Sequence, residues 1–93
     1  MSEGLTAYFS SVSSNMKIKK NQQHIQMILS SKKVQFEIVD VSKDPETLQK
    51  MRKLSGNTTA LPPQLFKGDK YLGDYEAFFE AVESETLDTF IEG

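Results

Sequence analysis

Residues 34–56 carry the pattern that most restricts the fold of this chain. The segment 34–41 (VQFEIVDV) alternates apolar with polar residues, which predicts a strand. A helix is predicted after it, because Asp44 suits the N-cap, Pro45 the first helical position and Gly56 the C-terminal stop. A similar pair precedes this one, since the run Leu5–Phe9 predicts a strand and a second helical pattern begins near Met16. Strand–helix–strand order predicts two parallel strands joined by a right-handed crossover.

The second half of the chain predicts a hairpin and two further helices. Pro62-Pro63 opens a short strand at 64–66, and the polar turn at 67–70 leads into another strand at 71–73. Asp74 suits the N-cap of a third helix, and Ser84 suits the N-cap of a last one. The order is then βαβαββα with a terminal helix. It predicts a single α/β domain over residues 1–93, with a four-stranded mixed sheet flanked by helices in a three-layer sandwich.

Composition excludes several kinds of chemistry. The 93 residues contain no cysteine and one histidine, His24. A disulfide framework, a thiolate metal site, an iron–sulfur cluster and a cysteine nucleophile are therefore ruled out, and we expect no metal or other cofactor. We expect His24 to be an exposed helix residue. The lysines are dispersed along the sequence and there is a single arginine, so we expect no nucleic-acid binding.

Charge is distributed unevenly along the sequence. The net charge is −2, yet the last twenty residues hold seven acids and no base. Such polarity can steer a charged partner, although solvated faces of two helices account for it equally well. We see no signal peptide and no apolar run long enough to span a bilayer, so we expect a monomeric cytoplasmic protein, with nuclear entry allowed by its small size.

The sequence resembles a glutaredoxin over essentially its whole length. It is more closely similar to the SH3-domain-binding glutamic-acid-rich-like family, above all to its shortest members, within the thioredoxin-fold superfamily. The residues that carry the resemblance are YFSSV at 8–12, IKKNQQ at 18–23, VDVS at 39–42, LPPQLF at 61–66 and GDKYLGDYE at 68–76. The resemblance implies a thioredoxin-like, glutaredoxin-like fold.

The first candidate site is the serine-rich loop at 10–15. The resemblance places Ser11, Ser13 and Ser14 where a glutaredoxin has its redox-active C-x-x-C at the start of the first helix. A serine hydroxyl is too weakly acidic to become a nucleophile unaided, and the sequence offers no Ser–His–acid pattern. We therefore expect turn and cap residues here, with Lys17 next to them.

The second candidate site is Leu61-Pro62-Pro63. The resemblance implies a cis peptide bond before Pro63 and assigns the residue before it a backbone contact with glutathione. Here that residue is Pro62, which has no N–H to donate. Family members that bind SH3 domains carry a P-x-x-P motif in this region, and this chain has Ala60 at the corresponding place. We therefore do not expect Leu61-Pro62-Pro63 to bind an SH3 domain.

The third candidate site is Gly73-Asp74-Tyr75-Glu76. The resemblance implies that a Gly-Gly turn here would present helix amides to a carboxylate of glutathione. Asp74 replaces the second glycine and adds a negative charge, while a helix N-cap is a sufficient structural role for it. The sequence therefore predicts weak or absent glutathione binding. The hypotheses are a non-catalytic protein-binding regulator, for instance one that modulates redox proteins by competing with glutaredoxins, and alternatively a weak glutathione binder without oxidoreductase activity. The sequence has no catalytic constellation to support an enzyme of another mechanism.

Overall fold

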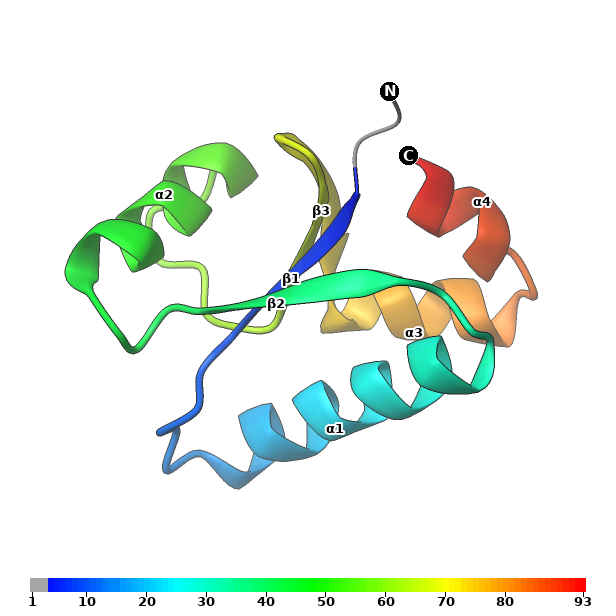
Figure 1. Ribbon diagram of the computed structural model, residues 1–93, viewed down its shortest axis with the longest axis horizontal. Helices are drawn as coiled ribbons and strands as arrows, with labels where there is room; N and C mark the ends of the chain where they lie inside the picture. Colours follow the sequence, from blue (N-terminus) through cyan, green and yellow to red (C-terminus); the bar gives the residue numbers. More distant parts are fainter. Residues whose placement is uncertain (1–3) are drawn as a thin grey trace.

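The computed structural model describes residues 4–93, and its elements follow the predicted order βαβαββα with a terminal helix (Figure 1). The elements are β1 (Leu5–Phe9), α1 (Met16–Ser31), β2 (Phe36–Asp40), α2 (Pro45–Ser55), β3 (Gln64–Lys67), β4 (Lys70–Asp74), α3 (Tyr75–Glu83) and α4 (Leu87–Glu92).

The four strands form one mixed sheet in the order β2-β1-β3-β4. β1 is parallel to β2, as the strand–helix–strand pattern predicts, and antiparallel to β3; β3 and β4 form the hairpin. Ala7 at the centre of β1 pairs with Ile38 on one side and Leu65 on the other. Because side chains alternate along a strand, this register sends two sets of residues to opposite faces of the sheet.

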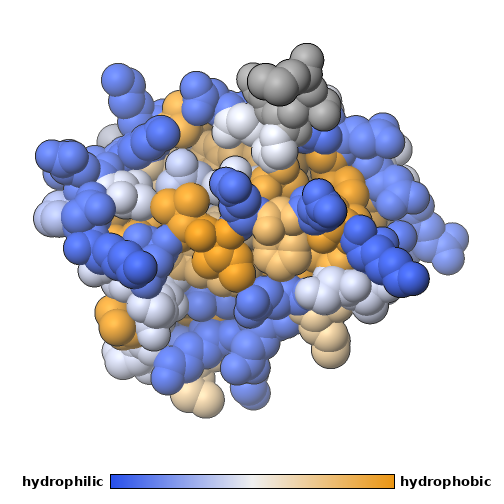
Figure 2. All heavy atoms as spheres, viewed as in Figure 1, coloured by the Kyte–Doolittle hydropathy of each residue, from blue (hydrophilic) through white to orange (hydrophobic). Residues whose placement is uncertain are grey.

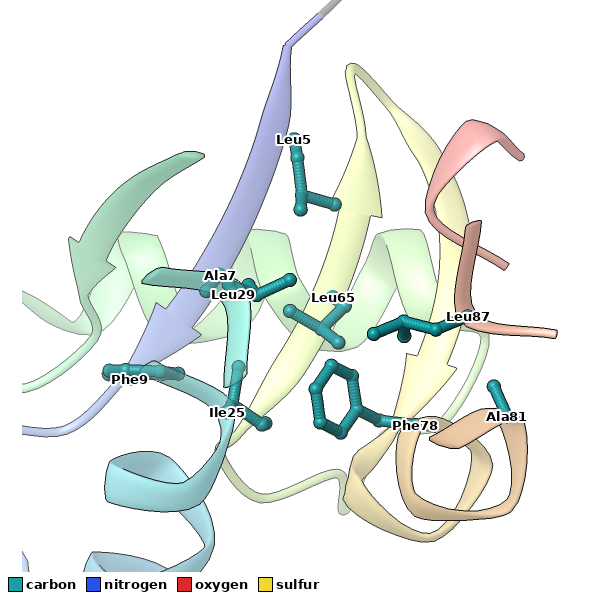
Figure 3. Close-up of a cluster of buried hydrophobic side chains, with 9 residues drawn as sticks. All are labelled: Leu5, Ala7, Phe9, Ile25, Leu29, Leu65, Phe78, Ala81 and Leu87. Atoms are coloured by element: carbon teal, nitrogen blue, oxygen red, sulfur yellow. The ribbon is translucent and has the colours of Figure 1, made fainter. Parts of the chain in front are cut away.

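Each face of the sheet builds its own core. Helices α1, α3 and α4 cover one face, and Figure 3 shows their buried side chains converging on those of β1 and β3. This cluster contains Leu5, Ala7, Phe9, Ile25, Leu29, Leu65, Phe78, Ala81 and Leu87. On the other face, α2 packs a smaller cluster that contains Tyr8, Val41, Met51, Ala60 and Phe66. Fully burying one large side chain such as Phe78 contributes about 1.5–3 kcal/mol.

Local capping signals set most helix ends. The Asp44 carboxylate accepts the Thr47 N–H at 2.8 Å at the start of α2. That helix ends at Gly56, whose φ of 72° is left-handed. Asp74 caps α3 by accepting the Ala77 N–H at 3.0 Å. These three predictions are confirmed.

Two predictions about element ends are wrong. Ser84 does not begin the last helix: it ends α3, where its hydroxyl donates to the Glu80 carbonyl at 2.7 Å, and the N-cap of α4 is Thr86. The second strand is shorter than 34–41, because the Val34 N–H still closes the end of α1 by donating to the Leu29 carbonyl at 3.0 Å.

β2 is an edge strand of the sheet. Figure 2 shows hydrophobic side chains along the middle of the face that β2 crosses, bordered by hydrophilic ones. Ile38 of this strand is 46% exposed.

Candidate functional site

A cleft with mixed polar and apolar walls lies at the end of the sheet where α1 and α3 begin. Its volume is about 480 Å³, and its walls come from the start of α1, the loop before β3 and the β4–α3 junction. Of the residues predicted for the site, Lys17, Leu61, Pro62, Pro63, Asp74, Tyr75 and Glu76 line it. Ser11, Ser13, Ser14 and Gly73 do not. A larger hollow of about 740 Å³, bordered by Gly4, Phe36 and Gly68, contains none of the candidate residues.

The serine loop is tied to the end of β2, and its serines Ser11, Ser13 and Ser14 contribute no wall to the cleft. The Ser11 hydroxyl and N–H donate to the Asp40 carboxylate at 2.5 and 3.2 Å. Ser42 donates to the same carboxylate from its hydroxyl at 2.6 Å and from its N–H at 2.9 Å. These donors, the Ser11 hydroxyl first, hold the pKa of Asp40 well below its usual range. Ser11 is therefore an anchoring residue of the loop.

The cap of α1 is an asparagine that the sequence analysis grouped with the loop. The Asn15 side-chain oxygen accepts the N–H groups of Lys17 at 2.9 Å and Ile18 at 3.3 Å. Ser13 has the turn role expected of it, since its hydroxyl oxygen accepts the Asn15 N–H at 3.2 Å. The first-turn amides that would stabilise a thiolate in a redox protein are thus engaged by a side chain of this protein.

The cleft wall formed by the two prolines is well packed. The Pro62–Pro63 peptide bond is cis, as predicted, and both rings are buried, whereas Leu61 is 56% exposed. The Leu61 carbonyl accepts the Gln64 side-chain amide at 2.8 Å, and the Gln64 oxygen accepts the Tyr71 hydroxyl at 2.7 Å. Pro62 offers no N–H, and the neighbouring carbonyl already has a donor. Neither proline of this wall can therefore donate a backbone hydrogen bond to a ligand.

The opposite wall is acidic. Asp74 and Glu76 stand at the start of α3, and Lys17 of α1 lines the same cleft. The Asp74 carboxylate already accepts the Ala77 N–H, so it both occupies a helix-terminal amide and places a negative charge there. Gly73 has a structural role: its φ is 151°, and a Cβ at this position would lie 2.7 Å from the Ala77 Cβ.

The sequence did not predict the side chains that hold Tyr75 in place, which are His24 and Phe79. His24 was expected to be exposed but is half-buried, and its Nδ1 lies 2.7 Å from the Tyr75 hydroxyl in a hydrogen bond. The rings of Tyr75 and Phe79 stack at 6.0 Å, and His24 lies 6.2 Å from Phe79. The signal available in the sequence was that His24 falls between Asn21 and Ile28 at helical spacing, on the flank of the buried stripe of α1.

Residues 4–93 contain neither a metal-binding cluster nor a membrane-spanning helix. Within residues 4–93, no three His, Cys, Asp or Glu side chains gather closely enough to hold a metal ion. In that same part of the chain, no helix is both long and apolar enough to cross a membrane.

The sheet order, the flanking helices and the cis-proline cleft define a thioredoxin-like fold of the glutaredoxin kind. The structure superposes on the C. albicans actin interacting protein Aip5 with a TM-score of 0.79, at 19% identity, covering 97% of this chain and 89% of that one. It superposes on a buckwheat glutaredoxin–glutathione complex with a TM-score of 0.69, at 12% identity, covering 96% and 76% of the two chains. At these identities the likeness concerns the fold.

The family follows from sequence. Residues 3–92 match the model of the SH3-binding, glutamic acid-rich protein family, and the chain belongs to that family. It is 38% identical over 99 residues to the SH3 domain-binding glutamic acid-rich protein homolog of Drosophila melanogaster. The match covers 94% of this chain and 63% of that relative, so the chain spans less than two thirds of the relative's length.

Proposed function

We propose that this chain is a non-catalytic protein-binding regulator that uses the cleft at the starts of α1 and α3. The observation that carries the proposal is that two backbone donors that the resemblance assigns to glutathione binding are not available in the cleft. Asp74 engages the Ala77 amide at the start of α3, and Pro62 lacks an N–H. With no cysteine in the sequence, thiol–disulfide exchange is also impossible.

The cleft suits a protein segment better than glutathione. Leu61, 56% exposed, provides an apolar contact at the edge of the cleft, and Lys17 and Glu76 provide charges of opposite sign. Such mixed walls favour a peptide with an apolar residue and a charged residue close together. The name of the C. albicans neighbour describes an interaction with a protein, which is consistent with this use of the scaffold.

The family name suggests SH3 domains as partners, but the two prolines do not suit that role. An SH3 domain reads an exposed polyproline II segment. Pro62 and Pro63 are buried and lead directly into β3. We propose instead that the cleft competes with true glutaredoxins for protein partners, since it presents a similar frame without the chemistry.

Site-specific photo-crosslinking tests the proposal. A photoreactive residue replaces Leu61 at the edge of the cleft, and in a matched control it replaces Ile38, an exposed apolar residue on β2. We expect discrete protein adducts from position 61 and few from position 38, and we expect Lys17→Glu to reduce the adducts from position 61. Equal adduct patterns from both positions, or none from position 61, would contradict the proposal.

A further inference from the structure

A second surface lies beside the cleft, where α3 packs against α1. Its centre is the aromatic group formed by His24, Tyr75 and Phe79, in which ring centroids lie 5.7–6.2 Å apart. The hydrogen bond between His24 Nδ1 and the Tyr75 hydroxyl, 2.7 Å long, fixes the two helices relative to each other at this point. The aromatic rings are therefore held in place before any partner arrives.

The outermost of these rings stays partly exposed. Phe78 is fully buried and supplies the core contact of α3, while Phe79 is 41% exposed. The Phe79 ring lies beside those of His24 and Tyr75. Met27, which is 63% exposed, follows His24 by three residues and so lies on the same side of α1. Together these side chains form an apolar surface that folding leaves uncovered.

Carboxylates border this apolar surface. Glu76 precedes Phe79 by three residues and Glu83 follows it by four, so both flank the ring on the surface of α3. Within residues 4–93, the one ion pair joins Lys32 to Asp88, at 3.5 Å between exposed side chains. Neither Glu76 nor Glu83 is thus neutralised by a salt bridge in the described structure. Both glutamates belong to the last twenty residues of the sequence, which contain seven acids and no base.

We propose that this aromatic–acidic surface (His24, Met27, Tyr75, Glu76, Phe79 and Glu83) docks an arginine-containing basic segment of another protein. A guanidinium group can stack on the exposed Phe79 ring and donate hydrogen bonds to a flanking carboxylate at the same time. An apolar residue next to the arginine in that segment would contact Met27. Arginine suits the site better than lysine, because its planar group both stacks and pairs.

The surface has its own determinants although it adjoins the cleft. Tyr75 and Glu76 border both, but Phe79 and Glu83 do not line the cleft. Substitutions at Phe79 and Glu83 therefore report on this surface alone. Failure of one proposal leaves the other open to its own test.

The test uses a short fluorescent peptide of alternating arginine and leucine, with fluorescence anisotropy as the measure of binding to the full chain. We expect saturable binding that Phe79→Ala weakens about threefold to fivefold, through loss of the stacked ring. Replacing the arginines with lysine should weaken binding, and replacing them with citrulline should abolish it. Thermal unfolding checks that Phe79→Ala folds, and Met16→Ala is the matched exposed apolar control.

One pair of substitutions decides whether the surface is specific. Glu83→Gln and Glu80→Gln change the net charge equally and lie on the same helix, but Glu80 faces a hollow toward α4 that Ala77, Ser84 and Phe90 also line. We expect Glu83→Gln to weaken binding about threefold and Glu80→Gln to change it less than about 1.5-fold. Equal losses would show attraction by net charge alone and overturn the proposal.

Backbone amide shifts on adding the peptide locate the contact. Shifts clustered at His24, Met27 and residues 75–83 are expected. The proposal is overturned by shifts centred on Lys17 and Leu61, which would place the peptide in the cleft. The absence of saturable binding would overturn it equally. So would sedimentation showing that the chain self-associates and buries this surface between its copies.

Discussion

The serine loop and the proline–α3 wall both lie at the end of the sheet where a glutaredoxin has its active site, and they differ in what they do for the fold. The loop anchors to β2 through Ser11, Asp40 and Ser42, all at or near the surface. The wall contains buried prolines and the capped start of α3, and Gly73, where an added Cβ would meet Ala77, lies directly before that cap. The residues of the wall also build the fold, whereas a loop outside the core tolerates substitution at a lower structural cost.

The largest effect is expected at Gly73, next to the wall. Gly73→Ala should lower the free energy of unfolding by about 3 kcal/mol, because the new Cβ meets Ala77 and the backbone conformation is strained for a side chain. Gly56→Ala is the control: its φ is 72°, with nothing within 4 Å of the added atom, so about 1 kcal/mol is expected. Urea unfolding measures both, and equal losses would mean that crowding at the wall is unimportant.

A smaller effect is expected at the cap of α3. Asp74→Ala should lower the free energy of unfolding by about 1 kcal/mol, because the Ala77 N–H loses its acceptor. Asp74→Asn keeps an acceptor and should cost no more than a few tenths of a kcal/mol. Denaturant unfolding of the two variants separates capping from charge. A loss in the asparagine variant as large as in the alanine variant would assign the role of Asp74 to its charge.

The smallest effect is expected in the serine loop, and it depends on pH. The pKa of Asp40 is lower in the folded chain than in the unfolded one, so the folded state binds fewer protons. Its contribution is present above the ordinary aspartate pKa of about 4 and is lost as the pH falls below that value. Replacing both Ser11 and Ser42 with alanine should make the free energy of unfolding fall less steeply between neutral and acidic pH. Superimposable pH profiles for the variant and the natural chain would show that the anchor does not hold the carboxylate ionised.

Sequence could predict the features that depend on neighbouring residues. The caps at Asp44, Gly56 and Asp74 are read from positions a few residues apart, and so is the alternation that sets the strands. The turning of the serine loop toward Asp40 depends on a contact between residues 29 positions apart, and the His24–Tyr75 bond joins residues 51 apart. Such contacts follow from packing of the helices against the sheet, which no local pattern encodes. The cleft residues Asn21, Asn57 and Thr59 were missed for the same reason, since the loop before β3 brings two of them to the site.

The central claim is that the cleft does not bind glutathione. It is tested most directly by titrating the isotope-labelled chain with reduced glutathione while following its backbone amides by NMR. A glutathione-binding glutaredoxin serves as the positive control. With the Ala77 amide already engaged and Pro62 without an N–H, we expect no saturable shifts up to millimolar ligand. Saturable shifts clustered at Lys17, Leu61 and residues 74–76 would show that the cleft binds glutathione, and would contradict this expectation.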